Sequence, residues 1–208
     1  MVDFLDVADG RSWQRAGRSD LIRLVTGRGQ AVVEFAPRLD FGRVPTRLVP
    51  RDGGLEVEGA VVPIVLRSPG VTWTIDEEGP HHTARAEVTL DPKQPLVLEL
   101  RHGSGSLREG GPEVGDRLKR SEAFWSGWVD GLRLPSVAAW EVVRSALVLK
   151  ALCFGPTGAI AAAGTTSLPE HLGGIRNWDY RYCWLRDAAM AASALVDLGS
   201  RDEAMEYL

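Results

Sequence analysis

The most informative stretch of the chain is RNWDYRYCWLRD, residues 176–187. These twelve positions hold four aromatic residues, two carboxylates and three guanidinium groups. Aromatic rings suit the apolar C–H face of a pyranose, and carboxylates and guanidinium groups bind hydroxyls through charge-assisted hydrogen bonds. The mixture therefore indicates a sugar-binding site. Because an alanine-rich run follows from Ala188, we expect the cluster to lie on a loop at the N-terminus of a helix.

The same residue types also fit a purely structural role. Arg176, Arg181 and Arg186 could pair with Asp179 and Asp187 in a buried salt network that plugs the end of a helical bundle. Composition alone leaves these two interpretations equally open.

The stretch from Asn177 to Ala188 resembles the first substrate-binding motif of glycoside hydrolase family 15, almost without interruption over twelve residues. That family holds glucoamylases, glucodextranases and bacterial trehalases. WEVVRSALVLK at 140–150 resembles the first barrel helix, and GAIAAAGTTSLPE at 158–170 resembles the loop after it. Weaker similarity to the β-domain of the bacterial members reaches back to VDFL at 2–5 and FGRV at 41–44. The resemblance thus covers most of the chain and is strong from about Trp140 onward.

The resemblance implies an inverting, exo-acting hydrolase of α-glucosidic bonds, of trehalase or glucoamylase type. In such enzymes one glutamic acid protonates the leaving oxygen and a second glutamate activates water. Both lie downstream of this motif in the family, so we assign no catalytic residue and expect the two glutamates beyond residue 208. We expect the chain alone to be inactive. Glu170, the glutamate beside the site loop, is expected to have a loop-anchoring or peripheral role.

The motif implies substrate-binding roles for four residues. Arg186 and Asp187 are expected to hold hydroxyls of the non-reducing glucose, and Tyr180 and Trp184 are expected to wall that pocket. For Trp178 and Asp179, binding and structural support stay equally open. Arg181 and Tyr182 are expected to point away from the site and pack.

The first half of the chain predicts β-structure. Short apolar or alternating runs are separated by Gly and Pro turns, which is typical of an antiparallel sandwich. They occur at 21–25, 31–35, 57–66, 71–75, 83–90 and 96–100. Gly27-Arg28-Gly29 predicts a hairpin between the first two. We expect a β-sandwich over 1–102 and a Gly-rich linker over 103–115.

From Asp116 onward the apolar period becomes helical. Ser136 is expected to cap an apolar helix that runs to about Phe154, and a helix from Ala188 ends at Gly199. Ser200 to Glu203 is a capping-box pattern for a further helix, which has barely begun at Leu208. The predicted class is α+β with several domains: the sandwich, the linker, and at 116–208 a linker helix and the truncated start of an (α/α)6 barrel.

Composition excludes other classes of function. The net charge of −4 and the absence of a basic cluster argue against nucleic acid, and no run is long enough to span a membrane. The N-terminus lacks a signal peptide, so a cytoplasmic location is expected. Cys153 and Cys183 are expected to be buried free thiols. The four histidines lack metal-ligand spacing, and we predict no metal or cofactor.

Two functions from different classes remain open. One is part of an exo-acting glycosidase whose partner is an α-glucoside, either trehalose or a maltooligosaccharide. The other is a non-catalytic carbohydrate-binding or regulatory β-domain fragment. Similarity of the β-domain to bacterial trehalases favours trehalose. The sequence does not predict an oligomeric state.

Overall fold

The computed structural model describes residues 1–7, 18–108, 112–165 and 169–208. Parts of the predicted β-domain, linker and site-proximal loop, at 8–17, 109–111 and 166–168, lie outside the described residues. The described residues form two compact units, one up to Ser121 and one from Glu122 to Leu208. Helix α1 (Val114–Asp130) contributes to both.

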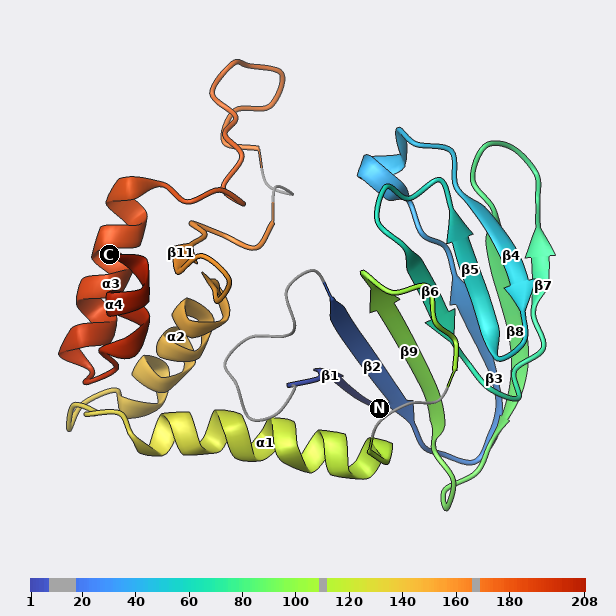
Figure 1. Ribbon diagram of the computed structural model, residues 1–208, viewed down its shortest axis with the longest axis horizontal. Helices are drawn as coiled ribbons and strands as arrows, with labels where there is room; N and C mark the ends of the chain where they lie inside the picture. The colour runs from blue at the N-terminus through green and yellow to red at the C-terminus, as the bar shows by residue number, and fades with distance from the viewer. Residues whose placement is uncertain (8–17, 109–111, 166–168) are drawn as a thin grey trace. The chain divides into compact units, whose positions relative to one another are not determined.

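The described part of the first unit consists mainly of two antiparallel sheets (Figure 1). The six-stranded sheet has the order β1 (Val2–Leu5), β2 (Ser19–Val25), β9 (Leu96–His102), β6 (Ile64–Arg67), β5 (Gly54–Glu58), β4 (Arg47–Arg51). The three-stranded sheet has the order β3 (Gly29–Phe35), β8 (Thr83–Leu90), β7 (Thr74–Asp76). A short 3-10 helix, η2 (Leu39–Gly42), follows β3.

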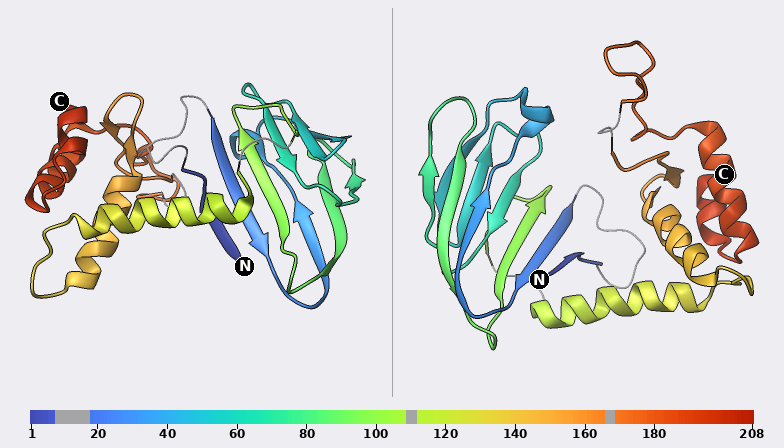
Figure 2. Two further views of the ribbon diagram at one scale, coloured as in Figure 1. Left: turned by 60° about the horizontal axis from the view of Figure 1, so that its bottom comes forward. Right: turned by 180° about the vertical axis from the view of Figure 1, so that it is seen from behind.

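The two sheets of this unit face each other (Figure 2). Side chains from both meet in one hydrophobic core. Leu48, Leu55 and Leu98 come from the larger sheet, and Ala84 comes from the smaller one. Strand β8 shows the cause, because its residues alternate between the core and solvent, as the two-residue period of a strand requires. Burying a leucine side chain contributes about 1.5–3 kcal/mol. These antiparallel sheets agree with the predicted sandwich, whereas the start of an (α/α)6 barrel stays a prediction.

The predicted hairpin around Gly27-Arg28-Gly29 is wrong. Strand β2 pairs with β1 and β9, while β3 pairs with β8 in the other sheet. A glycine-rich turn reverses the chain but does not determine which strand becomes the neighbour. Val33 and Phe35 of β3 pack against the core that the two sheets share, whereas β2 buries Ile22.

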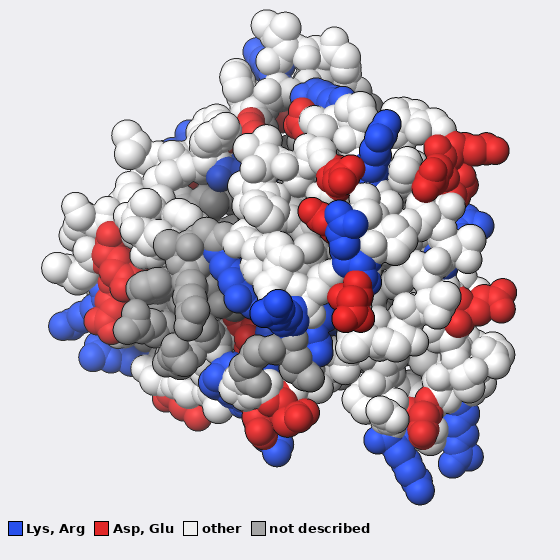
Figure 3. Space-filling model, turned by 45° about the vertical axis from the view of Figure 1, so that its right-hand side comes forward, with Lys and Arg blue, Asp and Glu red and all other residues white. Residues whose placement is uncertain are grey.

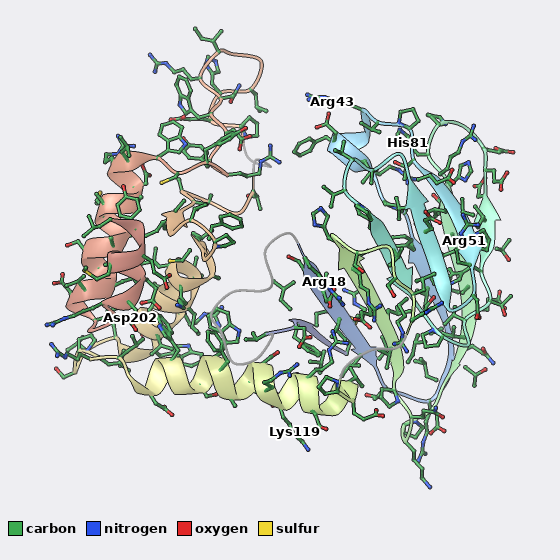
Figure 4. All side chains as sticks on the ribbon, viewed as in Figure 1. Arg18, Arg43, Arg51, His81, Lys119 and Asp202 are labelled. Atoms are coloured by element: carbon green, nitrogen blue, oxygen red, sulfur yellow. The ribbon has the colours of Figure 1, made fainter. Side chains whose placement is uncertain are left out.

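A buried ionic cluster joins the start of α1 to the larger sheet. Arg117 donates to Asp6 Oδ2 at 2.9 Å and to Glu99 Oε1 at 3.0 Å. Arg101 also binds Glu99, at 3.0 and 3.1 Å. Burial alone would raise the pKa of Glu99, but these guanidinium groups hold that pKa below its ordinary value. Arg18, labelled in Figure 4, binds the neighbouring Asp20.

The second unit packs short helices around a small two-stranded sheet. Its elements after α1 are α2 (Ala139–Ala151), β10 (Cys153–Phe154), β11 (Ala159–Ile160), α3 (Leu185–Asp197) and α4 (Asp202–Tyr207). Ile160, Ala188 and Ala191 form its buried centre. The small alanine side chains let α3 approach β11 closely.

Helix α2 differs from its prediction at both ends. It begins at Ala139, after Ala138 with φ 55° and no side-chain cap, so Ser136 does not cap it. It ends at Ala151, because Cys153 and Phe154 pair with β11 instead of continuing the helix. The helix buries one face rather than most sides, and Trp140 and Val148 are exposed.

A further helix, α4, does follow, but the predicted capping box does not form: α4 begins at Asp202 after Arg201, without a side-chain cap. Glu203 has another role. Its buried carboxylate accepts hydrogen bonds from Lys150 Nζ and from the Ser200 hydroxyl. Ser200 Oγ in turn accepts a hydrogen bond from Trp128 Nε1 at 3.0 Å. This chain of contacts joins α1, α2 and α4 within the second unit.

Surface charges of both signs lie interspersed on the face shown in Figure 3. Exposed ion pairs also connect neighbouring strands, such as Arg85–Glu34 and Arg51–Glu56. Among the described residues, the helices are all too short or too polar to cross a bilayer.

Candidate sugar-binding site

The predicted site lies on an exposed segment between β11 and the first turn of α3 (Figure 1). Two backbone bonds hold it, from Ala163 N to Tyr180 O at 2.8 Å and from Ala162 N to Tyr182 O at 3.1 Å. Helix α3 begins at Leu185, three residues before the predicted start. Arg186 and Asp187 therefore lie in the first helical turn rather than on the loop.

Three aromatic rings of this segment contact one another. Tyr180 stacks on Trp184, with ring centroids 5.3 Å apart and planes 21° apart. Trp178 meets Trp184 edge to face, with centroids 6.4 Å apart. We call Tyr180 and Trp184 the aromatic wall. A wall of this kind can hold the apolar face of a sugar ring.

Arg186 and Asp187 form a loose, solvent-exposed ion pair. Arg186 Nη2 lies 3.4 Å from Asp187 Oδ2, and the side chains are 76% and 34% exposed. Such a pair contributes little to stability, so it leaves donors and acceptors available to a ligand. The N-terminal end of α3 favours the negative charge of Asp187.

Tyr180 also contacts a carboxylate. Its hydroxyl donates a hydrogen bond to Glu170 Oε2 at 3.3 Å. Loss of solvent raises the pKa of Tyr180 above its ordinary value, and the negative charges of Glu170 and Asp187 raise it further. This contact agrees with the loop-anchoring role, one of the two expected for Glu170.

Asp179 makes hydrogen bonds to other residues of the same loop. It accepts two hydrogen bonds from the Arg181 guanidinium, at 3.0 and 2.7 Å, and its backbone carbonyl accepts one from Trp184 Nε1 at 3.1 Å. The Arg181 side chain, followed by the Arg181 backbone N–H, lowers the pKa of Asp179. Of the two roles left open for Asp179, these contacts favour structural support. Of the arginines in the predicted network, Arg181 pairs with Asp179 and Arg186 with Asp187, and both pairs lie on the surface rather than in a buried salt network.

Two predictions for this segment are wrong. Tyr182 does not pack, since its side chain is 67% exposed. Cys183 is exposed rather than buried, whereas Cys153 is half-buried and donates to Leu149 O at 3.4 Å. Burial raises the pKa of the Cys153 thiol. The apolar neighbours of Cys183 suggested a core position, but they lie on a surface loop.

Asn177 has a structural role in this region that was not predicted from the sequence. Its side chain exchanges hydrogen bonds with the backbone of His171 and donates another to Gly174 O. The signal was the asparagine shortly after Gly173-Gly174, a combination typical of turns. Among the described residues, His, Cys, Asp and Glu side chains do not gather in a group of three that could hold a metal ion.

Comparisons with known proteins match both parts of the chain. Residues 1–125 match the family model described as trehalase-like, N-terminal, and residues 137–208 match glycosyl hydrolases family 15. No solved structure matches.

Curated trehalases are among the similar proteins. The trehalase of Mycolicibacterium smegmatis is 32% identical over 196 residues, which cover 89% of this chain and 28% of that protein. The trehalase of Thermoplasma acidophilum is 45% identical over 92 residues, covering 44% of this chain and 16% of that protein. The trehalase of Mycobacterium tuberculosis is 43% identical over 97 residues, which cover 46% of this chain and 14% of that protein. The chain thus spans less than a third of the length of these relatives.

Proposed function

The chain belongs to the trehalase-like members of glycosyl hydrolases family 15, and from this we propose that it binds the non-reducing glucose of an α-glucoside for inverting hydrolysis. The observation that carries the proposal is the aromatic wall directly before the exposed Arg186–Asp187 pair on the first turn of α3. The four residues supply a stacking surface, donors and an acceptor within eight positions of the chain.

Each of these groups has a chemical task in the proposal. Tyr180 and Trp184 hold the C–H face of the glucose. Arg186 donates to sugar hydroxyls and Asp187 accepts from them, so a substrate lacking one hydroxyl leaves a charged group unpaired. No residue of this chain is assigned to proton transfer or to water activation.

The domain assignment is part of the same proposal. We take 1–102 as a trehalase-like β-sandwich, 103–115 as a linker, and 116–208 as the linker helix and first helices of an (α/α)6 barrel. Trehalose is the proposed substrate, because the relatives are named trehalases. The cytoplasmic location stays a prediction.

Hydrolysis by the full-length enzyme that carries this sequence tests the proposal. Trehalose is expected to be cleaved with a higher kcat/KM than maltose, with cellobiose as the β-linked control, each measured with and without phosphate. Inversion at one of the two anomeric carbons predicts that proton NMR shows equal amounts of α- and β-glucose before mutarotation. Trehalose binding without hydrolysis would support the non-catalytic alternative instead, and fresh product that is α-glucose alone would exclude inversion.

A further inference from the structure

The loop before the aromatic wall is closed by one side chain, that of Asn177. Asn177 Nδ2 donates to His171 O at 2.8 Å and to Gly174 O at 2.9 Å, while Oδ1 accepts from His171 N at 3.0 Å. An asparagine amide has an NH2 group that donates and an oxygen that accepts. Here both groups bind the backbone of one short turn. We call this arrangement the Asn177 latch.

The turn that the latch closes has a defined shape. Gly173 has φ +70°, a conformation that favours glycine. A Cβ atom at Gly174 would lie 2.3 Å from the His171 ring, so a side chain at this position would displace that ring. The two glycines let the backbone carbonyls of His171 and Gly174 face the Asn177 amide.

The latch has a direct consequence for the site. Glu170 is covalently next to His171, and its carboxylate accepts the Tyr180 hydroxyl bond across ten residues. Holding the His171 backbone against Asn177 therefore also restricts the position of Glu170, whose carboxylate accepts the Tyr180 hydrogen bond. Tyr180 is in turn stacked on Trp184.

We propose that Asn177 is a positioning residue that acts through Glu170 to hold the Tyr180 ring in the aromatic wall. The inference rests on the proposed function for its substrate role, but the latch itself can be tested without turnover. Asn177 does not touch the reacting bond in this proposal. It orders the surface on which the sugar ring stacks, before the substrate arrives.

Tyrosine ring signals test the latch in the 208-residue chain. The chain has only three tyrosines, so the Tyr180 signals can be assigned with Tyr180→Phe. In the wild type we expect the stacked Trp184 ring to displace the Tyr180 proton signals from their ordinary positions. Asn177→Ala is expected to move them toward those of a free tyrosine. His171→Ala is the matched control, because it keeps the backbone groups that Asn177 binds, and it is expected to leave the displacement in place.

Steady-state kinetics with trehalose test the role in substrate binding. A stacking wall contacts the sugar in both ground and transition states, so Asn177→Ala is expected to raise KM by roughly tenfold while kcat stays within about twofold. Asn177→Asp should be worse than the alanine variant, because a carboxylate cannot donate and would face two carbonyl oxygens. In a Glu170→Ala background, Asn177→Ala should add less than about twofold, since residues acting through one contact are not additive.

The outcomes separate the latch from the proposed function. Unchanged Tyr180 signals in Asn177→Ala would overturn the latch, and full additivity with Glu170→Ala would overturn its action through Glu170. A wild-type KM in Asn177→Ala, beside an active wild type, would overturn the substrate role alone. A wild type that cleaves neither trehalose nor maltose would overturn the proposed function and the substrate role together, while the Tyr180 signals would still decide the latch.

Discussion

Asp187→Asn is expected to lower kcat for trehalose in the full-length enzyme, with a loss of about 2–4 kcal/mol in transition-state stabilisation. Asp187 lies in the first turn of α3, and its side chain is only partly exposed beside Arg186. A charged acceptor on a sugar hydroxyl can strengthen as the ring flattens toward the oxocarbenium-like transition state. The amide keeps the shape of the carboxylate but removes its charge, so catalysis should suffer more than ground-state binding.

Trp178→Phe provides the comparison for Asp187→Asn. Trp178 meets Trp184 by its edge rather than by stacking, so a smaller ring at this position should have a smaller effect. Melting temperatures of both variants separate substrate binding from stability. If Asp187→Asn melts many degrees lower yet keeps a near-normal kcat/KM, Asp187 is a structural residue and its assignment to the sugar is wrong.

Lys150→Met is expected to lower the free energy of unfolding of the second unit by about 3–5 kcal/mol, because it leaves a buried carboxylate without its cation. The Lys150 and Glu203 side chains are only 6% and 5% exposed. Urea unfolding of the 208-residue chain measures the loss. Lys119→Met is the matched control, since Lys119 is 81% exposed and lies 3.9 Å from Asp116, and it should cost less than about 1 kcal/mol. Equal losses in the two variants would show that the buried pair does not stabilise the fold.

The same variant has a predicted pH dependence. Burial alone would raise the pKa of Glu203, but the bonds from Lys150 and Ser200 hold it below the ordinary value of 4.5. In the wild type this contribution to stability is therefore complete above pH 4.5 and is lost as the pH falls through the lowered pKa. Without Lys150 the pKa of Glu203 is no longer lowered by this contact, so the difference in unfolding free energy between wild type and Lys150→Met should narrow below pH 4.5. A difference that widens toward low pH would contradict the predicted direction.

The sequence predicted the positions of strands better than their partners. The alternating run 83–90 coincides with β8, because alternation is a local consequence of one buried face. Pairing depends on contacts between distant residues, such as Ser19 with His102. The signal at Gly27–Gly29 contains no information about those contacts, which explains the wrong hairpin.

The site shows the same division between local and distant information. The motif predicted that Tyr180, Trp184, Arg186 and Asp187 act together, and the structure places the two rings in a stack and the two charges in a pair. Their role in sugar binding stays a prediction. The asparagine shortly after Gly173-Gly174 indicates a turn, but it does not say which backbone groups the side chain binds. The Lys150–Glu203 pair depends on packing across 53 positions, which no local residue pattern predicts.

A crystal structure of the full-length enzyme with bound glucose would show whether these four residues hold the sugar. We expect glucose with one face on the Tyr180–Trp184 stack and with hydroxyls within hydrogen-bond distance of the Arg186 guanidinium and the Asp187 carboxylate. Glucose bound at another site, with these four side chains untouched, would contradict it.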